Sequence, residues 1–339
     1  MMDFRTQVQI SESFFKIDHF TKMMLFGSCF SENIGRKLKD NKFHVDINPF
    51  GILYNPLSIS SSIRKLLQKT IFTESDLIYN NELYHSFMHH GSFSDTDKNH
   101  CLNNISKRYN ESADSIIKTD MFLITFGSAY VYRLKEAGEN IKSDIVNNCH
   151  KLPADSFDRR RLSVEEIVEE WSVIISLLRD INLDVKFIFT VSPIRHWKDG
   201  AHENQISKSI LHLAIDRLIG LFGNDLIYFP AYEIMIDELR DYRFYDEDMM
   251  HPSSFAVDYI WYNFSKTFFS DVTKAINLEW TQIKKSIDHK PLFPGTNSYN
   301  NFLKLTISNL EKFALKYSHI NCEHEIQKIS TLLNSQDLD

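Results

Sequence analysis

The chain has 339 residues, 43% of them hydrophobic and 24% charged, with a net charge of −7. This composition is typical of a globular protein that buries a sizeable core, and the acidic balance argues against a nucleic-acid partner. No stretch approaches the roughly 18 apolar residues of a membrane span. The first twenty residues contain no apolar run of the kind found in signal peptides. We therefore expect a cytoplasmic protein with no membrane partner.

The four cysteines, Cys29, Cys101, Cys149 and Cys322, are scattered and form no Cys-x-x-Cys pair. A zinc knuckle, a thioredoxin-like redox site and a disulfide framework are therefore all disfavoured. Phosphate-loop and dinucleotide fingerprints are also absent. We expect a protein without a metal or an organic cofactor.

Residues 1–20 read as a lead-in that packs on the domain through Phe14, Phe15 and Phe20. An apolar run over 23–26 follows and ends at Gly27, which permits a sharp turn. A hydroxyl comes next at Ser28, and helix-forming sequence covers about 31–40. Strand, Gly-Ser and helix in this order can hold a nucleophile at the carboxyl edge of a parallel sheet. Most Gly-Ser pairs, however, are ordinary turns.

A second strand is predicted over 43–47, followed by a loop rich in Pro, Gly and Asn and by a helix over 56–69. The span 71–96 contains His85, His89 and His90. On a helix, the first two would share a face, as metal ligands can. No Glu or Cys completes the ligand set, so we interpret this span as a polar loop over the mouth of the site.

The middle of the chain alternates predicted helices and strands. A helix over 101–118 leads into a buried strand over 121–126, and a capping box at 163–166 opens the clearest helix. A strand over 185–191 is followed by a helix over 203–222 and a strand over 225–229. This alternation predicts βαβ units and a parallel sheet covered on both faces.

The last part of the chain is predicted to be helical. One helix is expected over 254–276, a break over 290–295, and a loosely amphipathic helix over 299–333. We therefore divide the chain into a domain over 1–274 and a helical C-terminal extension over 275–339. The extension is expected to serve packing or association, with a second copy of the chain as the candidate partner.

A possible base follows at Asp248-Met249-Met250-His251-Pro252. A Ser hydroxyl becomes a good nucleophile when a base takes its proton, and a carboxylate commonly orients that base. His251 lies just before a predicted helix, and Asp248 is close enough in sequence to hold its other ring nitrogen. Asp246 and Glu247 compete for that role. An acidic, solvated loop is the alternative interpretation of the whole segment.

The string Gly27-Ser28-Cys29-Phe30 resembles the signature of the GSCFA branch of the SGNH/GDSL hydrolases. The resemblance extends over roughly residues 20–270 and rests on further strings in the same order. These are Asn48-Pro49-Phe50-Gly51, Asn55-Pro56, Thr125 to Ala129, Asn148 to Lys151, Val191 to Pro193 with Arg195-His196, and Asp248 to Pro252.

The resemblance implies a three-layer α/β/α sandwich with a central parallel sheet, SGNH-hydrolase-like and flavodoxin-like. It implies Ser28 as nucleophile, His251 as base and Asp248 as the orienting acid. The implied reaction is hydrolysis or transfer of an O-acyl ester through an acyl-enzyme.

One departure from the SGNH pattern concerns the oxyanion hole. Gly51 fits the glycine of the second SGNH block, but Gly127-Ser128-Ala129-Tyr130 lacks the asparagine of the third. Losing one oxyanion donor typically costs about 10²–10³ in rate. Candidate replacements are Ser128, Asn148 and Asn55. Arg195 or His196, at a strand exit, is a candidate for binding an anionic part of the substrate.

The first hypothesis is a serine esterase or acyltransferase of SGNH type, acting on an O-acyl group of a carbohydrate or small metabolite. The alternative is a binding or assembly protein that keeps the fold without turnover. A metal-dependent hydrolase using His85, His89, His90 and His150 is a third hypothesis. Alpha/beta-hydrolase chemistry is disfavoured because no Gly-x-Ser-x-Gly elbow occurs.

Overall fold

The computed structural model describes residues 6–135 and 145–336. The chain separates into two compact units, which we describe in turn. The large unit comprises the residues up to 14, 22–37 and 45–267, and the small unit comprises 15–21, 38–44 and 268 onward. The start of the expected lead-in and the charged stretch 136–144 lie outside the described residues. In the described ranges, no helix has the length and apolar character needed to cross a bilayer.

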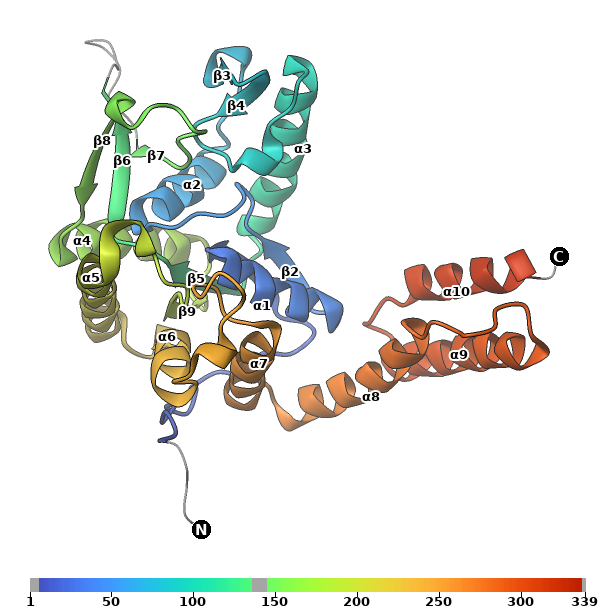
Figure 1. The fold of residues 1–339 in the computed structure, drawn as a ribbon. Helices are drawn as coiled ribbons and strands as arrows, with labels where there is room; N and C mark the ends of the chain where they lie inside the picture. The colour runs from blue at the N-terminus through green and yellow to red at the C-terminus, as the bar shows by residue number, and fades with distance from the viewer. Residues whose placement is uncertain (1–5, 136–144, 337–339) are drawn as a thin grey trace. The chain divides into compact units, whose positions relative to one another are not determined.

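A parallel five-stranded sheet forms the centre of the large unit (Figure 1). Its strand order β10-β9-β5-β1-β2 becomes 2-1-3-4-5 when read from β2 and numbered along the chain, which is the flavodoxin-like order. This confirms the predicted sheet and places its topological switch point between β1 and β5. The strands are β1 (Lys22–Gly27), β2 (His44–Ile47), β5 (Met121–Phe126), β9 (Lys186–Val191) and β10 (Leu226–Tyr228).

Helices cover the sheet, as the three-layer prediction requires. Phe26, Phe126 and Phe189 share an apolar core with Trp171, whose ring lies 5.1 Å from both Phe126 and Phe189. Side chains that alternate with these along the strands, such as Leu25, are buried as well. The helices of this unit are α1 (Cys29–Asp40), α2 (Pro56–Gln68), α3 (Lys98–Ile116), α4 (Val164–Ile181), α5 (Gly200–Phe222), α6 (Ala231–Glu233) and α7 (Ser254–Phe268).

The predicted capping box of α4 is present. The Ser163 hydroxyl accepts the Glu166 amide hydrogen at 3.1 Å, and the Glu166 carboxylate accepts that of Ser163 at 2.8 Å. Two backbone donors that the helix leaves unpaired are thereby satisfied. The apolar positions expected to face the core are buried: Ile167, Trp171, Ile174, Ile175 and Leu178.

Two antiparallel additions to the fold were not predicted. The span expected to be a polar loop contains a hairpin of β3 (Leu77–Asn80) and β4 (Leu83–Ser86). Its turn residues Asn81 and Glu82 both have positive φ, as a type I′ turn requires, but no glycine signals this turn in the sequence. A second sheet, in the order β7-β6-β8, contains β6 (Tyr130–Leu134), β7 (Ile145–Val146) and β8 (Phe157–Arg161).

Three further expectations are wrong in detail. Helix α1 begins at Cys29, directly after Ser28, and not near Ser31. The helix expected over 254–276 is interrupted, because Ser270 caps a new helix. Phe14 is 72% exposed and does not anchor the lead-in, whereas Phe15 stacks on Phe268 at 6.2 Å and Phe20, although 64% exposed, stacks on His319 at 4.3 Å.

The small unit contains α8 (Asp271–Ile287), α9 (Asn297–Lys316) and α10 (Glu323–Gln336). Helices α9 and α10 lie side by side (Figure 1), and the predicted single tail helix is therefore two helices. The Trp280 indole donates a hydrogen bond to the Asp40 carbonyl at 2.7 Å. The unit has its own apolar core, which includes Ile276, Trp280, Leu303, Leu310, Phe313 and Ile320.

Candidate active site

Ser28 occupies the switch point of the sheet, between the end of β1 and the start of α1. Gly27 makes this turn with φ +144°, and a Cβ there would lie 2.4 Å from the Thr125 carbonyl oxygen of β5. Only glycine therefore lets the two strand ends approach this closely. The Gly27 amide donates to the Asn48 side-chain oxygen at 2.9 Å, which ties β1 to the loop after β2. Ser28 itself is fully buried.

The Ser28 hydroxyl makes its side-chain hydrogen bond with Ser192. Their oxygens are 2.9 Å apart, and the Phe30 amide also donates to the Ser28 oxygen at 3.3 Å. Ser192 follows β9 as Ser28 follows β1, and it is equally buried. The sequence analysis quoted Ser192 as part of a motif but did not treat it as a site residue. A hydroxyl directly after a buried strand was the available signal.

The buried Lys208 links the residues that follow β5 and β9, next to this serine pair. The Lys208 ammonium donates to the Gly127 carbonyl at 2.8 Å and to the Ser192 carbonyl at 2.7 Å. Complete burial lowers the pKa of Lys208 to about 7. The sequence analysis missed this residue, although a lysine on the apolar stripe of α5, beside Leu211 and Ile215, was a visible anomaly.

His251 and Asp248 form a pair on the loop before α7. The His251 Nδ1 and an Asp248 carboxylate oxygen are 2.5 Å apart. The other carboxylate oxygen accepts the amide hydrogens of Met250 and His251, both at 2.9 Å. These backbone bonds, followed by the His251 ring, lower the pKa of Asp248 to about 2. The competing carboxylate of Asp246 instead accepts the next backbone amide at 2.9 Å.

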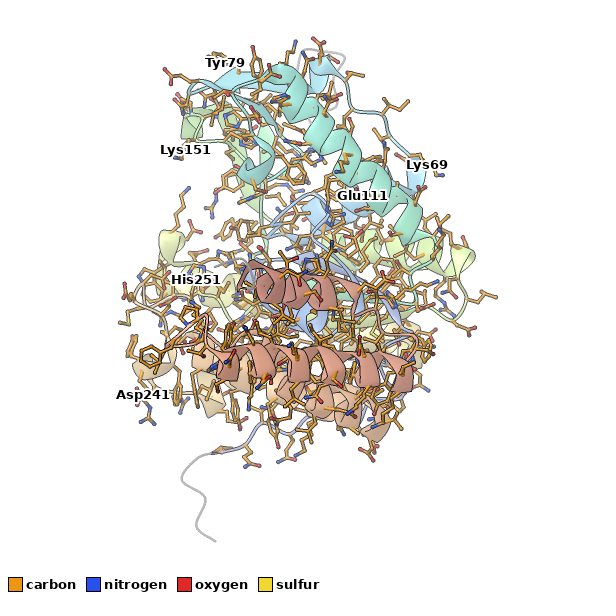
Figure 2. The ribbon with its side chains drawn as sticks, turned by 90° about the vertical axis from the view of Figure 1, so that its right-hand side faces the viewer. Lys69, Tyr79, Glu111, Lys151, Asp241 and His251 are labelled. Carbon is orange, nitrogen blue, oxygen red and sulfur yellow. The ribbon has the colours of Figure 1, made fainter. Side chains whose placement is uncertain are left out.

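The two halves of the expected triad have different surroundings. Ser28 is fully buried, whereas the side chains of His251 and Asp248 are 43% and 40% exposed. Figure 2 shows His251 on one flank of the ribbon. Within the described part of the chain, no hydrogen bond joins Ser28 to His251. The loop is tied to the strand exits through its backbone, because the Arg195 amide donates to the Met250 carbonyl at 3.2 Å.

His196 lies between these two halves. Its Nε2 is 3.3 Å from the place that a Cβ on Gly127 would occupy, and its ring meets the Tyr54 ring edge-on at 5.5 Å. This nitrogen is buried and finds no hydrogen-bond partner among the described residues. Burial, with smaller effects from Lys208 and His251, lowers the pKa of His196 to about 3. At neutral pH the ring is therefore uncharged, and it can offer a hydrogen-bond donor but not a cation.

Two of the expected oxyanion donors have backbone amides that are already engaged. The Gly51 amide donates to the Asn48 carbonyl at 2.8 Å, within a turn. The Ser128 amide donates to the Tyr54 carbonyl at 2.8 Å, and the Ser128 hydroxyl accepts the Tyr130 amide hydrogen at 3.2 Å.

The two expected asparagine donors have structural roles. Asn55 caps α2, because its side-chain oxygen accepts the Ser58 amide hydrogen at 2.8 Å while its nitrogen donates to the Ser58 hydroxyl at 2.9 Å. The Asn148 side-chain oxygen accepts the His150 amide hydrogen at 2.9 Å. Both residues therefore brace the loops that carry them.

Arg195 lies next to the His251 loop, packed among aromatic rings. Its guanidinium carbon is 4.6 Å from the centre of the Trp197 ring and 5.1 Å from that of Tyr245. Its Nε is buried, and residues 6–135 and 145–336 offer it no hydrogen-bond partner.

The histidines of the metal hypothesis have protein partners. His85 contacts the Ser94 hydroxyl at 2.6 Å and stacks on His150 at 4.4 Å, and His150 contacts the Ser86 carbonyl at 2.8 Å. His89 stacks on Phe50 at 4.8 Å. Among the described residues, no three His, Cys, Asp or Glu side chains are grouped as a metal site requires.

Comparison with known proteins gave matches to family models and to solved structures. The GSCFA family model matches residues 22–264, and the model of the GSCFA domain protein C-terminal domain matches residues 280–335. A search of curated proteins found no match. Two of the solved structures that match have TM-scores of 0.33 and 0.35.

The first is a carbohydrate esterase family 3 from Talaromyces cellulolyticus, 10% identical, covering 76% of this chain and 98% of that one. The second is an acetyl xylan esterase (Est2A) from the rumen bacterium Butyrivibrio proteoclasticus, also 10% identical, covering 73% and 63%.

Proposed function

This chain belongs to the GSCFA family, and we propose that it is a serine esterase or acyltransferase of SGNH type. Its substrate would be an O-acyl ester of a carbohydrate or a small metabolite. The observation that carries the proposal is the pair formed by His251 and Asp248, on a loop tied to the strand exits beside Ser28. A buried serine at the switch point of a parallel sheet, with a carboxylate-oriented imidazole nearby, fits nucleophilic acyl transfer.

In the proposed reaction, His251 takes the proton from the Ser28 hydroxyl as the serine oxygen attacks the ester carbonyl. The tetrahedral intermediate expels the alcohol, which receives that proton from His251. Water or an acceptor hydroxyl then attacks the acyl-enzyme, with His251 again as the base, and Ser28 is regenerated. Asp248, ionised at any pH above about 2, holds the imidazole in the productive tautomer.

The proposal requires the Ser28 hydroxyl to exchange its partner. In the free chain it is hydrogen-bonded to Ser192, and it has to leave this partner before it can give its proton to His251. Catalytic hydrogen bonds are often long or misaligned before substrate binds. Ser192 would then hold the nucleophile in place between turnovers.

His196 is the oxyanion donor that we propose in place of the missing asparagine. Its Nε2, which has no hydrogen-bond partner among the described residues, lies next to Gly127. Gly127 is the first residue of the block from which that asparagine is absent. A neutral imidazole can stabilise a developing oxyanion by donating a hydrogen bond. The lowered pKa of His196 keeps it neutral across the working range of an esterase.

Labelling with a fluorophosphonate tests the proposed function. We expect stoichiometric labelling of the wild-type chain at Ser28 and none in Ser28→Ala. Ser31→Ala is the matched control and should label like the wild type, because Ser31 is as buried as Ser28 and lies three residues later in α1 but has no role in the proposed mechanism. Equal labelling of Ser28→Ala and the wild type would contradict the covalent mechanism.

The second candidate function is a binding or assembly protein without turnover. The bond between Ser28 and Ser192, in place of one between Ser28 and His251, is the observation that favours it. It predicts no labelling of Ser28 and no burst with activated esters, whatever their acyl group.

A further inference from the structure

A cavity of about 390 Å³ in the large unit lies next to the proposed active site but includes none of its three triad residues. This volume is within the range of about 300–1,000 Å³ typical of small-molecule sites. Its lining includes Arg195, Trp197, Gln205, Tyr232, Tyr242 and Tyr245.

Backbone contacts tie this cavity to the catalytic loop. The Arg195 amide donates to the Met250 carbonyl at 3.2 Å, one residue before His251. On the other side, Tyr245 forms a bridge with Pro252, one residue after His251. In Figure 2, Asp241, which also lines the cavity, lies below His251 on the same flank. In the proposed mechanism His251 protonates the leaving alcohol, so the cavity adjoins the alcohol side of the ester.

The wall of the cavity has an unusual backbone. Residues Ile234–Glu238 form a π-helix, and three of them, Met235, Ile236 and Asp237, line the cavity. π-Helical turns are rare and frequently occur at functional sites. Asp237 of this π-helix also pairs with Arg240, another residue of the cavity lining, at 3.5 Å.

Among the residues that the structure describes, no carboxylate pairs with Arg195, whose polar neighbour is the Tyr245 hydroxyl, so its guanidinium is available to an anion. The other arginine of the lining, Arg240, is paired with Asp237, and Asp241 contacts Arg243 at 3.8 Å. The Arg195 guanidinium lies near three rings, at 4.6 Å from Trp197, 5.1 Å from Tyr245 and 5.8 Å from Tyr242. Its buried Nε accordingly donates no hydrogen bond within the described part of the chain.

The charged side chains of the cavity lining indicate the charge of the ligand. A guanidinium whose faces are stacked presents its edge, which suits a planar carboxylate. Arg240 and Arg243 offset the charges of Asp237 and Asp241, so the single positive charge of Arg195 balances a monoanion but not a dianionic phosphate. A single carboxylate therefore fits the lining better than a phosphate.

The aromatic residues of the cavity lining indicate the uncharged part of the ligand. Aromatic rings with polar tips suit a ring that is apolar on its faces and hydroxylated at its edges. The Tyr232 hydroxyl contacts the Gln205 side-chain oxygen at 2.5 Å, so both are fixed at the wall. Burial raises the pKa of Tyr245, and Arg195 opposes the rise, so this hydroxyl stays protonated and able to donate at neutral pH.

From these observations we propose that the cavity binds an acidic sugar as the alcohol part of the substrate, with its carboxylate on Arg195. The proposal rests on the proposed function only for the assignment to the alcohol side. Binding itself does not require Ser28 to react.

Calorimetry on the full chain carrying Ser28→Ala tests the proposal without turnover. The probes are glucuronate, glucose, benzoate and inorganic phosphate at matched pH and ionic strength. We expect glucuronate to bind at least about 10-fold more tightly than glucose, as one charge-assisted hydrogen-bonded pair allows. Adding Arg195→Met should remove the preference, and Arg195→Lys should retain part of it.

Arg159→Met is the matched control, because the Arg159 guanidinium also lies over an aromatic ring, 3.8 Å from the centre of Tyr130, and neither Arg159 nor its partner Asp199 lines the cavity. It should leave glucuronate binding unchanged, with thermal unfolding showing that each variant is folded. Equal affinities for glucuronate and glucose, or tighter binding of benzoate or phosphate, would overturn the proposal, as would binding of none of the probes. If glucuronate binds but Ser28 is never labelled, the proposed esterase function fails and the acidic-sugar site stands.

Discussion

The nucleophile and the base of the proposed site are built in contrasting ways. Ser28 is fully buried where a parallel strand becomes a helix, and Ser192 and Lys208 add hydrogen bonds around it. His251 and Asp248 are about 40% exposed and are oriented by contacts within a single short loop. We call the first region the rim (Gly27, Ser28, Gly127, Ser192 and Lys208) and the second the loop (residues 246–252).

The rim and the loop are held in place by contacts of different sequence range. The rim is fixed by long-range contacts, since Ser28 meets Ser192 across 164 positions of the chain. The loop is fixed by local contacts, since Asp248 bonds to the backbone two and three residues later. In the proposed mechanism, the locally oriented base has to come within hydrogen-bond reach of this rigidly held nucleophile when substrate binds.

Removing the base should have the largest effect. We expect His251→Ala to lower kcat by about 10⁴–10⁶, as single losses from a catalytic triad do. The rim and the loop act as one unit in this mechanism, so Ser28→Ala combined with His251→Ala should lose no more than either alone. Burst kinetics with an activated ester measure this. Losses that multiply would show that the two residues act independently.

Replacing the orienting carboxylate should have the next largest effect. Asp248→Asn should lower kcat by about 10³–10⁴ through loss of imidazole orientation. The pKa of Asp248 is lowered to about 2, so in the wild type its charge is lost only as pH falls through that value. The acid limb of the pH–rate profile above pH 4 should therefore not follow Asp248. Asp246→Asn is the control and should retain wild-type activity.

A third variant probes the residue between the rim and the loop. His196→Ala should lower kcat by about 10²–10³ with little change in KM, the usual result of losing one oxyanion donor. His196→Asn restores a donor and should recover part of the loss. Because the pKa of His196 is about 3, its removal should not shift the profile between pH 5 and 8. An unchanged kcat in His196→Ala would remove it from the oxyanion hole.

The smallest effect concerns stability. Lys208→Met leaves the Gly127 and Ser192 carbonyls without their donor, and we expect a loss of about 1–3 kcal/mol in the free energy of unfolding. Burial lowers the folded-state pKa to about 7, so the unfolded chain binds more protons from there to about 10.5. The contribution of Lys208 to wild-type stability therefore rises with pH across this range.

Urea unfolding at pH 6, 7, 8 and 9 would measure this contribution, and the rise should be smaller in Lys208→Met. Lys198→Met is the control, since Lys198 lies in a solvent-facing turn. Parallel pH dependences in the wild type and Lys208→Met would show that Lys208 titrates normally.

Local patterns carried most of the fold prediction. The capping box of α4 and the apolar runs of β1, β5 and β9 were readable because their signals lie within a few residues of the elements they specify. The β3–β4 hairpin was missed because its turn uses Asn81 and Glu82 with positive φ, without the glycine that normally marks such a turn.

The site residues also divide into those whose contacts follow from local sequence and those whose contacts come from distant parts of the chain. The sequence proposed Ser28, Asp248 and His251, and the contact between the last two follows from their spacing of three residues. Asn55, which the sequence proposed as an oxyanion donor, instead caps α2, next to Pro56 at the start of the helix. The sequence did not assign Ser192 or Lys208 to the site, because each acquires its role from residues more than 15 positions away.

By itself, the sequence determined the strand-turn-helix around Ser28, the Asp248–His251 turn and the alternation that produces a parallel sheet. These follow from short-range sterics and hydrogen bonding, which depend on neighbouring residues. Only the tertiary structure decided which serine shares a hydrogen bond with Ser28, that His196 stays neutral, and that Arg195 lines a cavity. Those properties depend on burial and on which strand ends meet, which chain packing sets.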